Sequence, residues 1–471
     1  MEEQKKKINL AFLPAWGAGH TPSTIELAKR LLLHPSSAGR LSVTLILTPS
    51  TAAFSSSLAL LPTSSSSSIS IYYLPSIELP SLQSTDGMSD HAARCFQLYT
   101  PHIKSALAAT SASAIIIDYF ATAVIDAANE LRIPTYVYIP FNASMLALVL
   151  HLPTLHDEIP LEFDQFQGQI HVPGLPPIPP FSMPSPFMDK KNRQYTWSIY
   201  HAQRLKHVRG ILVNTFRALE KGVISAIESD KSVPTVHPVG PILHFSAGVR
   251  HECLHWLDEQ PAASVVFLCF GSMGMMTAAQ AAEAAAGIER SGYRFLWILR
   301  LAGGEKDGLP LGFRERTKGK GIVWEGWVPQ MEILDHMAVG GFVTHGGWNS
   351  ILESLWHGVP MVTWPMYAEQ HLNAFEMAAE MGLAAEMAMD RRQEGWVTAE
   401  EVESKVRWLM EDSEEGRKVR ERVKEMKAAS REAVEKGGQS WNELDKIVTE
   451  LLNESGEFGV NTRLHSEHSY E

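Results

Sequence analysis

A histidine and an aspartate stand where two apolar segments end, and together they could move a proton. His20 follows the apolar run Ile8–Leu13 and a glycine-rich turn, and Asp118 closes the apolar run Ala114–Ile117. A carboxylate on one imidazole nitrogen fixes the tautomer and stabilises the charged ring, which leaves the other nitrogen as a base. The pair therefore predicts general-base chemistry. The alternatives are a purely structural histidine and an aspartate that caps the helix after it.

A second cluster lies between residues 327 and 370 and suits an anion. Gly341–Thr344 predicts a buried strand, and Gly346-Gly347 a tight turn before a helix from about Ser350. The helix start offers unpaired N–H groups and the positive end of its dipole, which favour a phosphate. Ser350-Ile-Leu-Glu353 also fits a capping box, in which both residues only satisfy the helix start. Polar and aromatic residues nevertheless converge on this turn: Trp327, Gln330, His345, Trp348, Asn349, Glu353, Trp364, Glu369 and Gln370.

A competing motif stands near the middle of the chain. His251-Glu252-Cys-Leu-His255 fits the zinc-hydrolase pattern H-E-x-x-H, in which two histidines one helical turn apart bind zinc and the glutamate is the base. A working site needs a third ligand and a long helix, and Pro261 cuts this element short. A zinc hydrolase is therefore a remote alternative.

The elements that must position these groups alternate regularly. Near-continuously apolar strands separated by helices indicate a parallel sheet covered on both faces. In such sheets ligands lie at the carboxyl ends of the strands, where both His20 and Asp118 emerge. The expected strands are Ile8–Pro14, Leu41–Thr48, Ile69–Leu74, Ala114–Asp118 and Thr135–Ile139, and the expected helices are Pro22–Leu33, about His91–Ala109 and Ala121–Leu131.

The turn after the first strand does not complete a dinucleotide fingerprint. G-x-G-x-x-G needs a third glycine where Pro22 stands, which argues against a dehydrogenase. Thr21 is the expected helix cap, with Pro22 at the first helical position.

The second half repeats the strand–turn–helix pattern. Ser264–Phe270 predicts a buried strand that ends at Gly271-Ser272, with a helix from about Ala278, and the Ser272 hydroxyl can donate to a phosphate. Phe295–Leu299 and Gly321–Trp324 continue the sheet. Helices from about Thr398 and Glu414 carry dense mixed charge, which is typical of a solvated face.

Length and composition set the bounds. At 471 residues two domains are expected, and 45% hydrophobic with 20% charged residues is ordinary for a globular enzyme. A net charge of −12 argues against nucleic acid or an anionic membrane as partner. Three scattered cysteines imply no disulfide framework. Without an apolar stretch of about 18 residues or a signal-peptide pattern, we expect no membrane span and a cytoplasmic protein.

The stretch from Trp327 to Gln370 resembles the signature box of plant secondary-product glycosyltransferases, the UDP-sugar-using members of glycosyltransferase family 1. It reads W-V-P-Q…G-G-F…H-x-G-W-N-S…E…G-V-P…W-P…E-Q, with Gly346 where many members carry Cys. His20, in P-x-x-G-x-G-H, and Asp118 match the family's catalytic dyad. Segments 150–159, 172–188 and 210–220 are similar to the branch that acts on flavonoids, chalcones and other phenolics.

This resemblance implies the GT-B fold, an α/β arrangement of two facing Rossmann-like domains with parallel sheets and an interdomain cleft. The expected division is an acceptor-binding domain over 1–245, a linker over 246–256 and a UDP-sugar-binding domain over 257–440. The last helix, about 440–456, would pack back on the first domain, and 457–471 would be a disordered tail.

The implied function is an inverting glucosyltransferase that moves glucose from UDP-glucose to a flavonoid- or chalcone-like phenol. An O-linked product is expected, with C-glucosylation as the alternative. Neither a metal nor another cofactor is expected, since the chain has no D-x-D, and the protein is expected to be a monomer. His20 would be the base and Asp118 its support, with Phe120, Phe141 and Met145 in the acceptor pocket.

The resemblance also implies the donor contacts. Trp327 would stack on uracil with Val328 and Gln330 beside it, and Glu353 would take the ribose hydroxyls. The diphosphate would lie against Ser272, His345, Gly347, Asn349 and Ser350. The sugar would meet Trp348, Glu369 and Gln370; Gln370 is similar to glucose-selective members, whereas His there often accompanies galactose.

Overall fold

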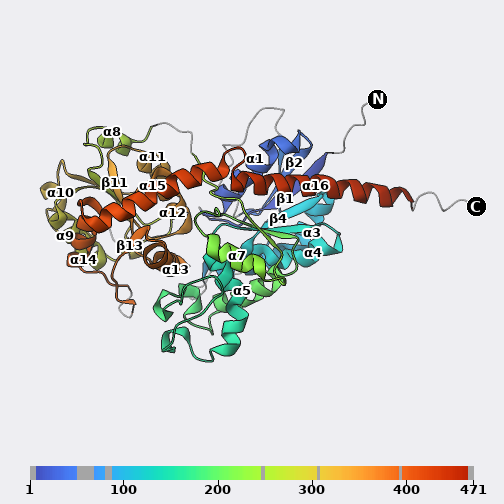
Figure 1. The fold of residues 1–471 in the computed structure, drawn as a ribbon, viewed down its shortest axis with the longest axis horizontal. Coiled ribbons are helices and arrows are strands. Elements are labelled where there is room, and N and C mark those ends of the chain that lie inside the picture. The colour runs from blue at the N-terminus through green and yellow to red at the C-terminus, as the bar shows by residue number, and fades with distance from the viewer. Residues whose placement is uncertain are drawn as a thin grey trace, which may run out of the picture.

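The computed structural model describes residues 7–17, 19–49, 68–79, 87–245, 250–304, 308–391 and 395–464, with side chains up to 453. This part of the chain forms two parallel sheets, each in its own half of the molecule and each flanked by helices (Figure 1). The α/β class with two parallel sheets is therefore confirmed.

The first sheet has seven strands in the order β3-β2-β1-β4-β5-β6-β7. β1 pairs with β4 in parallel, with Leu13 opposite Ile117, so the residues that follow these two strands leave the sheet side by side. The strand bounds are β1 Ile8–Leu13, β2 Leu41–Leu47, β3 Ile69–Tyr73, β4 Ala114–Asp118, β5 Thr135–Ile139, β6 Gly210–Val213 and β7 Thr235–Pro238.

The helices of this half differ from the predicted ones at two ends. α1 begins at Thr21 and His20 takes the cap position, one residue earlier than predicted, while the Thr21 hydroxyl donates to the Ala15 carbonyl at 2.7 Å. The predicted helix 121–131 is a 3₁₀ turn, η3, followed by a short α4, because the Asp118 carboxylate accepts the Phe120 N–H and tightens the start. The bounds are α1 Thr21–Leu33, α3 Met88–Ala109, η3 Tyr119–Val124, α4 Ile125–Glu130, α5 Ala143–Glu158, α6 Arg193–Leu205 and α7 Lys221–Ser229.

The second sheet has six strands in the order β10-β9-β8-β11-β12-β13, again all parallel. β11 lies between β8 and β12, so the turns after β8 and β11 are neighbours. The strands are β8 Val265–Cys269, β9 Arg294–Ile298, β10 Gly321–Trp324, β11 Val339–Thr344, β12 Met361–Thr363 and β13 Ala384–Glu386. The helices are α8 Glu252–Asp258, α9 Ala278–Ser291, α10 Phe313–Arg316, α11 Gln330–Leu334, α12 Trp348–His357, α13 Gln370–Phe375, α14 Ala399–Met410 and α15 Glu414–Val434.

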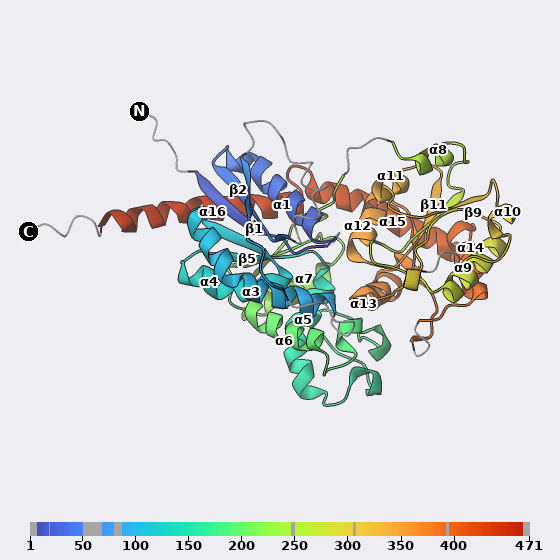
Figure 2. The same cartoon turned by 180° about the vertical axis from the view of Figure 1, so that it is seen from behind.

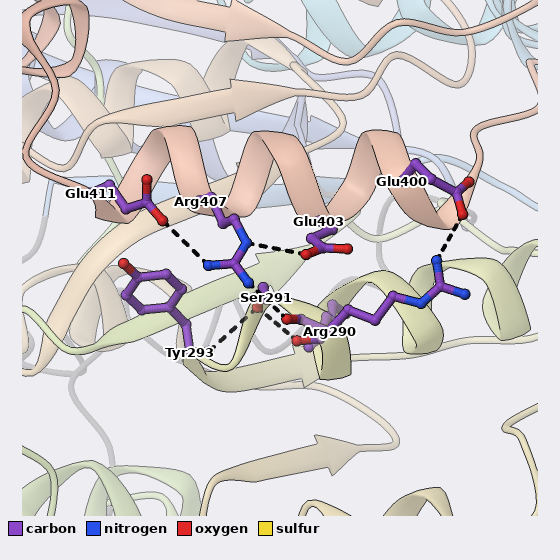
Figure 3. Close-up of polar contacts among 8 residues, drawn as sticks. Arg290, Ser291, Tyr293, Glu400, Glu403, Arg407 and Glu411 are labelled. Atoms are coloured by element: carbon purple, nitrogen blue, oxygen red, sulfur yellow. Dashed lines mark hydrogen bonds and ion pairs between the residues drawn. The ribbon is translucent and has the colours of Figure 1, made fainter.

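The mixed charge of the C-terminal helices lies on a solvated face, as its pattern predicts. Figure 3 shows α9 and α14 side by side, with Arg290 paired to Glu400 at 2.7 Å. Arg407 contacts Glu403 on its own helix at 3.1 Å and Glu411, the residue after its last turn, at 3.4 Å. Exposed ion pairs of this kind contribute little to stability, so the apolar faces beneath them hold α9 and α14 together.

The last helix, α16 Gln439–Leu464, runs from the second half across the first (Figures 1 and 2). Its apolar side joins the core beneath β1 and β2, and Glu450 accepts hydrogen bonds from Arg209 at 2.7 Å and Tyr136 at 3.2 Å. The tail from 457 was predicted to be disordered, but α16 continues to Leu464, because polarity alone does not end a helix and no proline follows. Residues 465–471 lie outside the described part. No helix within the described ranges is long and apolar enough to cross a bilayer.

Candidate active site

His20 and Asp118 meet at the edge of the first sheet. Nδ1 of His20 lies 2.7 Å from Oδ2 of Asp118, which is fully buried, while the histidine side chain keeps 23% of its surface exposed. Oδ1 of Asp118 accepts the backbone N–H of Phe120 at 3.0 Å. Asp118 therefore caps the following helical turn, the alternative to catalysis that the sequence offered. It does so with Oδ1, whereas Oδ2 binds His20. The carboxylate does both.

The electrostatics of His20 favour proton uptake. Burial lowers the pKa of its imidazole, but the charge of Asp118, the hydrogen bond to it and the charge of Glu369 outweigh burial, so the pKa is raised. With Nδ1 held by Asp118, Nε2 is the nitrogen left to accept a proton. The arrangement is that of a general base supported by a carboxylate.

Two glycine turns of the second half enclose the ring of His345. A Cβ added to Gly271 or to Gly347 would come within 2.5 Å of His345 Nε2, so both turns need glycine for this close approach. Burial, with the positive charge of Arg300 as the second cause, lowers the pKa of His345 to about 4. The imidazole is therefore neutral at pH 7 and can offer a hydrogen bond without needing a counter-ion.

The start of α12 decides how Ser350 and Glu353 are used. The helix begins at Trp348 with Gly347 as its cap residue, so Ser350 and Glu353 lie inside the helix. The predicted start at about Ser350, and with it the capping-box alternative, is wrong. Gly346 has φ of +76°, a conformation that favours glycine.

Gln330, Ser350 and Glu353 form one polar cluster between α11 and α12. Nε2 of Gln330 donates to Glu353 Oε2 at 2.6 Å and to Ser350 Oγ at 2.9 Å. Burial raises the pKa of Glu353 to about 7, although the bond from Gln330 lowers it. A carboxylate with so little compensation in the protein is suited to accept hydrogen bonds from a ligand.

Trp327 lies beyond this cluster with its indole in solvent. The residue is 72% exposed, and within the described ranges its one ring contact is with His251, with centroids 6.5 Å apart. An exposed indole of this size is a platform on which a flat ring could stack. The side chain of Val328, next in the chain, is buried in the core, so Val328 could contact a ligand only through its peptide group.

Trp348 and Asn349 connect the two halves of the molecule. The buried Trp348 indole donates to the Asn214 carbonyl at 2.6 Å, and Nδ2 of Asn349 donates to the Gly19 carbonyl at 3.1 Å. The Trp348 side chain is thus occupied in packing, and its backbone N–H donates to the Glu369 carboxylate. Oδ1 of Asn349 is buried without a hydrogen-bond partner in the described chain. The contact with Gly19 places the start of α12 next to His20.

Glu369 and Gln370 close the same corner. Burial raises the pKa of Glu369, against the charge of His20 and hydrogen bonds from Asn373 and the Trp348 backbone. Gln370 is buried, and its Oε1 accepts the backbone N–H groups of Met366 at 2.9 Å and Tyr367 at 3.0 Å. The Gln370 side chain also has a hydrogen bond with the Tyr367 side chain. The structure therefore brings Glu369 to the dyad but turns Gln370 partly toward its own loop.

The three predicted acceptor-pocket residues fall in different places. Phe120 lies against His20 with ring centroids 5.2 Å apart, and Phe141 is one ring further, 5.1 Å from Tyr119. Met145 is buried in the core of the first half. Phe120 is thus the one of the three that borders the dyad directly.

The zinc-protease motif has a structural role in the observed fold. His251 caps α8, and its Nδ1 accepts the backbone N–H of Cys253 at 3.3 Å. No group of three metal-ligating side chains occurs in the described ranges. The short helix gives His251 and His255 no third partner.

Sequence reasoning missed two residues that organise the site. Nδ2 of Asn373 donates to the Gly346 carbonyl at 2.9 Å, and its Oδ1 accepts from Asn142 of the first half at 3.0 Å. Arg300 donates to the carbonyls of Gly271 and Ser272. Arg300 follows the predicted strand Phe295–Leu299, and its place at the carboxyl end of a strand was the available signal.

Known proteins match this chain along nearly its whole length. A malvidin galactosylase from Oryza sativa subsp. japonica is 42% identical over 478 residues, which cover 95% of this chain and 98% of the relative. The chain belongs to the plant family 1 UDP-glycosyltransferases. The family profile described as "UDP-glucoronosyl and UDP-glucosyl transferase" matches residues 213–419. The enzyme is thus a UDP-glycosyltransferase, and its co-substrate is a UDP-sugar.

Solved structures of the family have the same GT-B fold. A UDP-glucosyltransferase from Polygonum tinctorium capable of glucosylating indoxyl superposes with a TM-score of 0.88 at 33% identity, covering 96% of this chain and all of that one. A Medicago truncatula family member complexed with UDP-glucose gives a TM-score of 0.86 at 34% identity, again covering 96% and 100%. The predicted GT-B fold is confirmed.

Proposed function

We propose that this UDP-glycosyltransferase transfers glucose from UDP-glucose to the hydroxyl of a phenolic small molecule, with inversion at the anomeric carbon. The observation that carries the proposal is the His20–Asp118 pair beside the start of α12, joined through the contact of Asn349 with Gly19. Malvidin for the Oryza sativa relative and indoxyl for the Polygonum tinctorium enzyme are flat aromatic hydroxyl compounds, which supports the acceptor class.

The proposed reaction is one displacement. Nε2 of His20 takes the proton of the phenolic hydroxyl as the oxygen attacks the anomeric carbon. The new oxygen–carbon bond forms while the bond from that carbon to the β-phosphate oxygen breaks, and UDP leaves with the electron pair. Asp118 stabilises the imidazolium that results, in line with its effect on the His20 pKa. Attack opposite to the leaving group inverts the centre.

The donor is proposed to lie along the second half from Trp327 to Glu369. Uracil stacks on the exposed indole of Trp327, and the ribose hydroxyls donate to Glu353. The diphosphate meets the N–H groups at the start of α12, the neutral His345 ring, Asn349, Ser350 and the Ser272 hydroxyl. The sugar reaches Glu369 and the Gln370 amide, next to His20. The proposed site needs no metal ion, since helix dipole and neutral donors face the leaving group.

Phe120 is the residue that we propose to border the acceptor ring, because its ring lies 5.2 Å from that of His20. A phenol lying against the edge of Phe120, beside His20, would present its hydroxyl to Nε2. Phe141 and Met145 are proposed as a more distant wall of the pocket.

Glucose is the proposed sugar and an O-glycoside the proposed product. Galactose is the competing sugar, favoured by the name of the malvidin galactosylase at 42% identity. The test is a set of phenolic acceptors incubated with UDP-glucose or UDP-galactose, with UDP release and product mass followed. Faster turnover with UDP-glucose and an acid-labile product support the proposal. Preference for UDP-galactose would overturn the sugar, and an acid-stable product the linkage.

A further inference from the structure

The phosphate end of the proposed donor site contains a cation that the signature box does not include. Arg300 follows β9 at the carboxyl edge of the second sheet, beside the turn after β8. Its guanidinium donates to the carbonyls of both Gly271 and Ser272. In the described ranges, the hydrogen bonds of Arg300 go to these carbonyls and none goes to a carboxylate. In a protein with net charge −12, a guanidinium whose charge is not neutralised by a carboxylate can attract an anionic ligand.

The position of Arg300 couples the two glycine turns. Gly271, which Arg300 holds, packs so closely on His345 that a Cβ there would lie 2.5 Å from Nε2. A Cβ added to Gly347, at the cap of α12, would lie at the same distance from the same nitrogen. Movement of the Gly271–Ser272 turn would therefore move His345 against the helix start. Burial lowers the pKa of His345 and raises that of Tyr367; the positive charge of Arg300 adds to the first shift and opposes the second, so both side chains lie within its electrostatic range.

We propose that Arg300 is a positioning residue for the β-phosphate of the donor: it fixes the Gly271–Ser272 turn through two carbonyls and supplies the positive charge that the departing diphosphate meets. A guanidinium has five N–H donors, so two bonds to carbonyls leave others for a phosphate oxygen. This inference rests on the proposed placement of the diphosphate between this turn and α12.

The test compares UDP with UMP, which lacks the β-phosphate. Titration calorimetry of the full-length protein at fixed ionic strength gives the affinity of each nucleotide for wild type, Arg300→Gln and Arg300→Lys. We expect Arg300→Gln to weaken UDP roughly 10- to 100-fold, as for loss of hydrogen bonds to a charged group, with UMP within about two-fold of wild type. Arg300→Lys keeps the charge but cannot hold both carbonyls equally, so its ratio of UDP to UMP affinity should fall between the two.

Arg294→Gln is the matched control, because Arg294 begins the same strand at its opposite end and donates to Gln260 at 3.0 Å. It should leave the ratio of UDP to UMP affinity unchanged. Equal losses of UDP and UMP affinity in Arg300→Gln, or no loss, would overturn the proposal. Should Arg300→Gln fail to fold by thermal unfolding, an unchanged ratio in Arg300→Lys would overturn it instead. A wild type that binds UDP no better than UMP would refute the placement of the diphosphate itself.

Discussion

The replacement Glu353→Gln separates a ligand-binding carboxylate from a structural one. The Glu353 side chain is held by Gln330 at 2.6 Å inside α12, and burial raises its pKa to about 7. If the carboxylate accepts the ribose hydroxyls, only its ionised form binds the donor well. Protonation must then compete with binding, and the apparent dissociation constant for UDP-glucose should rise as the pH falls through 7.

The size of the effect follows from this pKa. Relative to high pH, the dissociation constant of wild type should double near pH 7 and be about ten times larger near pH 6. Glu353→Gln should bind roughly 10- to 100-fold more weakly at pH 8 and lose this pH dependence. UDP-glucose is the right probe because its diphosphate, esterified at both ends, has no group that titrates in this range.

Glu353→Gln should weaken donor binding but stabilise the folded protein at high pH. The pKa of Glu353 in the folded protein, about 7, exceeds its ordinary value of 4.5. Below about pH 4.5 this difference leaves the free energy of unfolding unchanged. As the pH rises, it lowers that free energy, by up to about 3 kcal/mol above about pH 7. Glu353→Gln should therefore raise the free energy of unfolding at pH 8 and leave it unchanged near pH 4.5.

Calorimetry of UDP-glucose binding between pH 5.5 and 8.5, together with urea unfolding of both proteins, measures these quantities. Glu289→Gln on exposed α9 is the control for loss of a carboxylate elsewhere. Wild-type affinity in Glu353→Gln, or affinity in wild type that does not vary with pH, would refute the ribose assignment. If Glu353→Gln instead lost about 1 kcal/mol of unfolding free energy and bound UDP-glucose normally, Glu353 would have a structural role only.

Two further replacements probe the same site. Trp327→Ala should weaken UDP binding by about 1–3 kcal/mol and leave thermal stability unchanged, because stacking on a base is lost while the 72% exposed indole packs on little else; calorimetry that finds no change would exclude the stacking. Gly347→Ala should reduce both the unfolding free energy, by about 1–3 kcal/mol, and UDP affinity, because its Cβ would collide with His345; a variant with normal binding and stability would show that the His345 ring is free to move.

The sequence could predict where the His20–Asp118 pair and the glycine turns after β8 and β11 lie, because each lies at the end of a strand or in the turn after it. An apolar run that ends in Asp118 and another that leads to His20 determine the sheet edge at which both emerge, and parallel pairing of β1 with β4 makes them neighbours. Glycine before a helix likewise indicates where an anion could lie. These are local patterns, and tertiary packing did not alter them.

What could not be predicted depends on contacts between the two halves. Nothing near Trp348 in the sequence indicates that its indole N–H is taken by the Asn214 carbonyl, more than a hundred residues away. The same holds for Asn373, which links Gly346 to Asn142. The capping box at Ser350 failed because α12 begins earlier, at a glycine cap that the S-x-x-E pattern does not register.

The most direct test of the account is the turnover number of His20→Ala with saturating UDP-glucose and a phenolic acceptor. Removing the base that Asp118 holds at 2.7 Å should lower turnover roughly 10²–10⁴-fold, while the affinity for UDP-glucose, measured on the same preparation, stays within about two-fold of wild type. Turnover equal to that of wild type would contradict the assignment of His20 as the base.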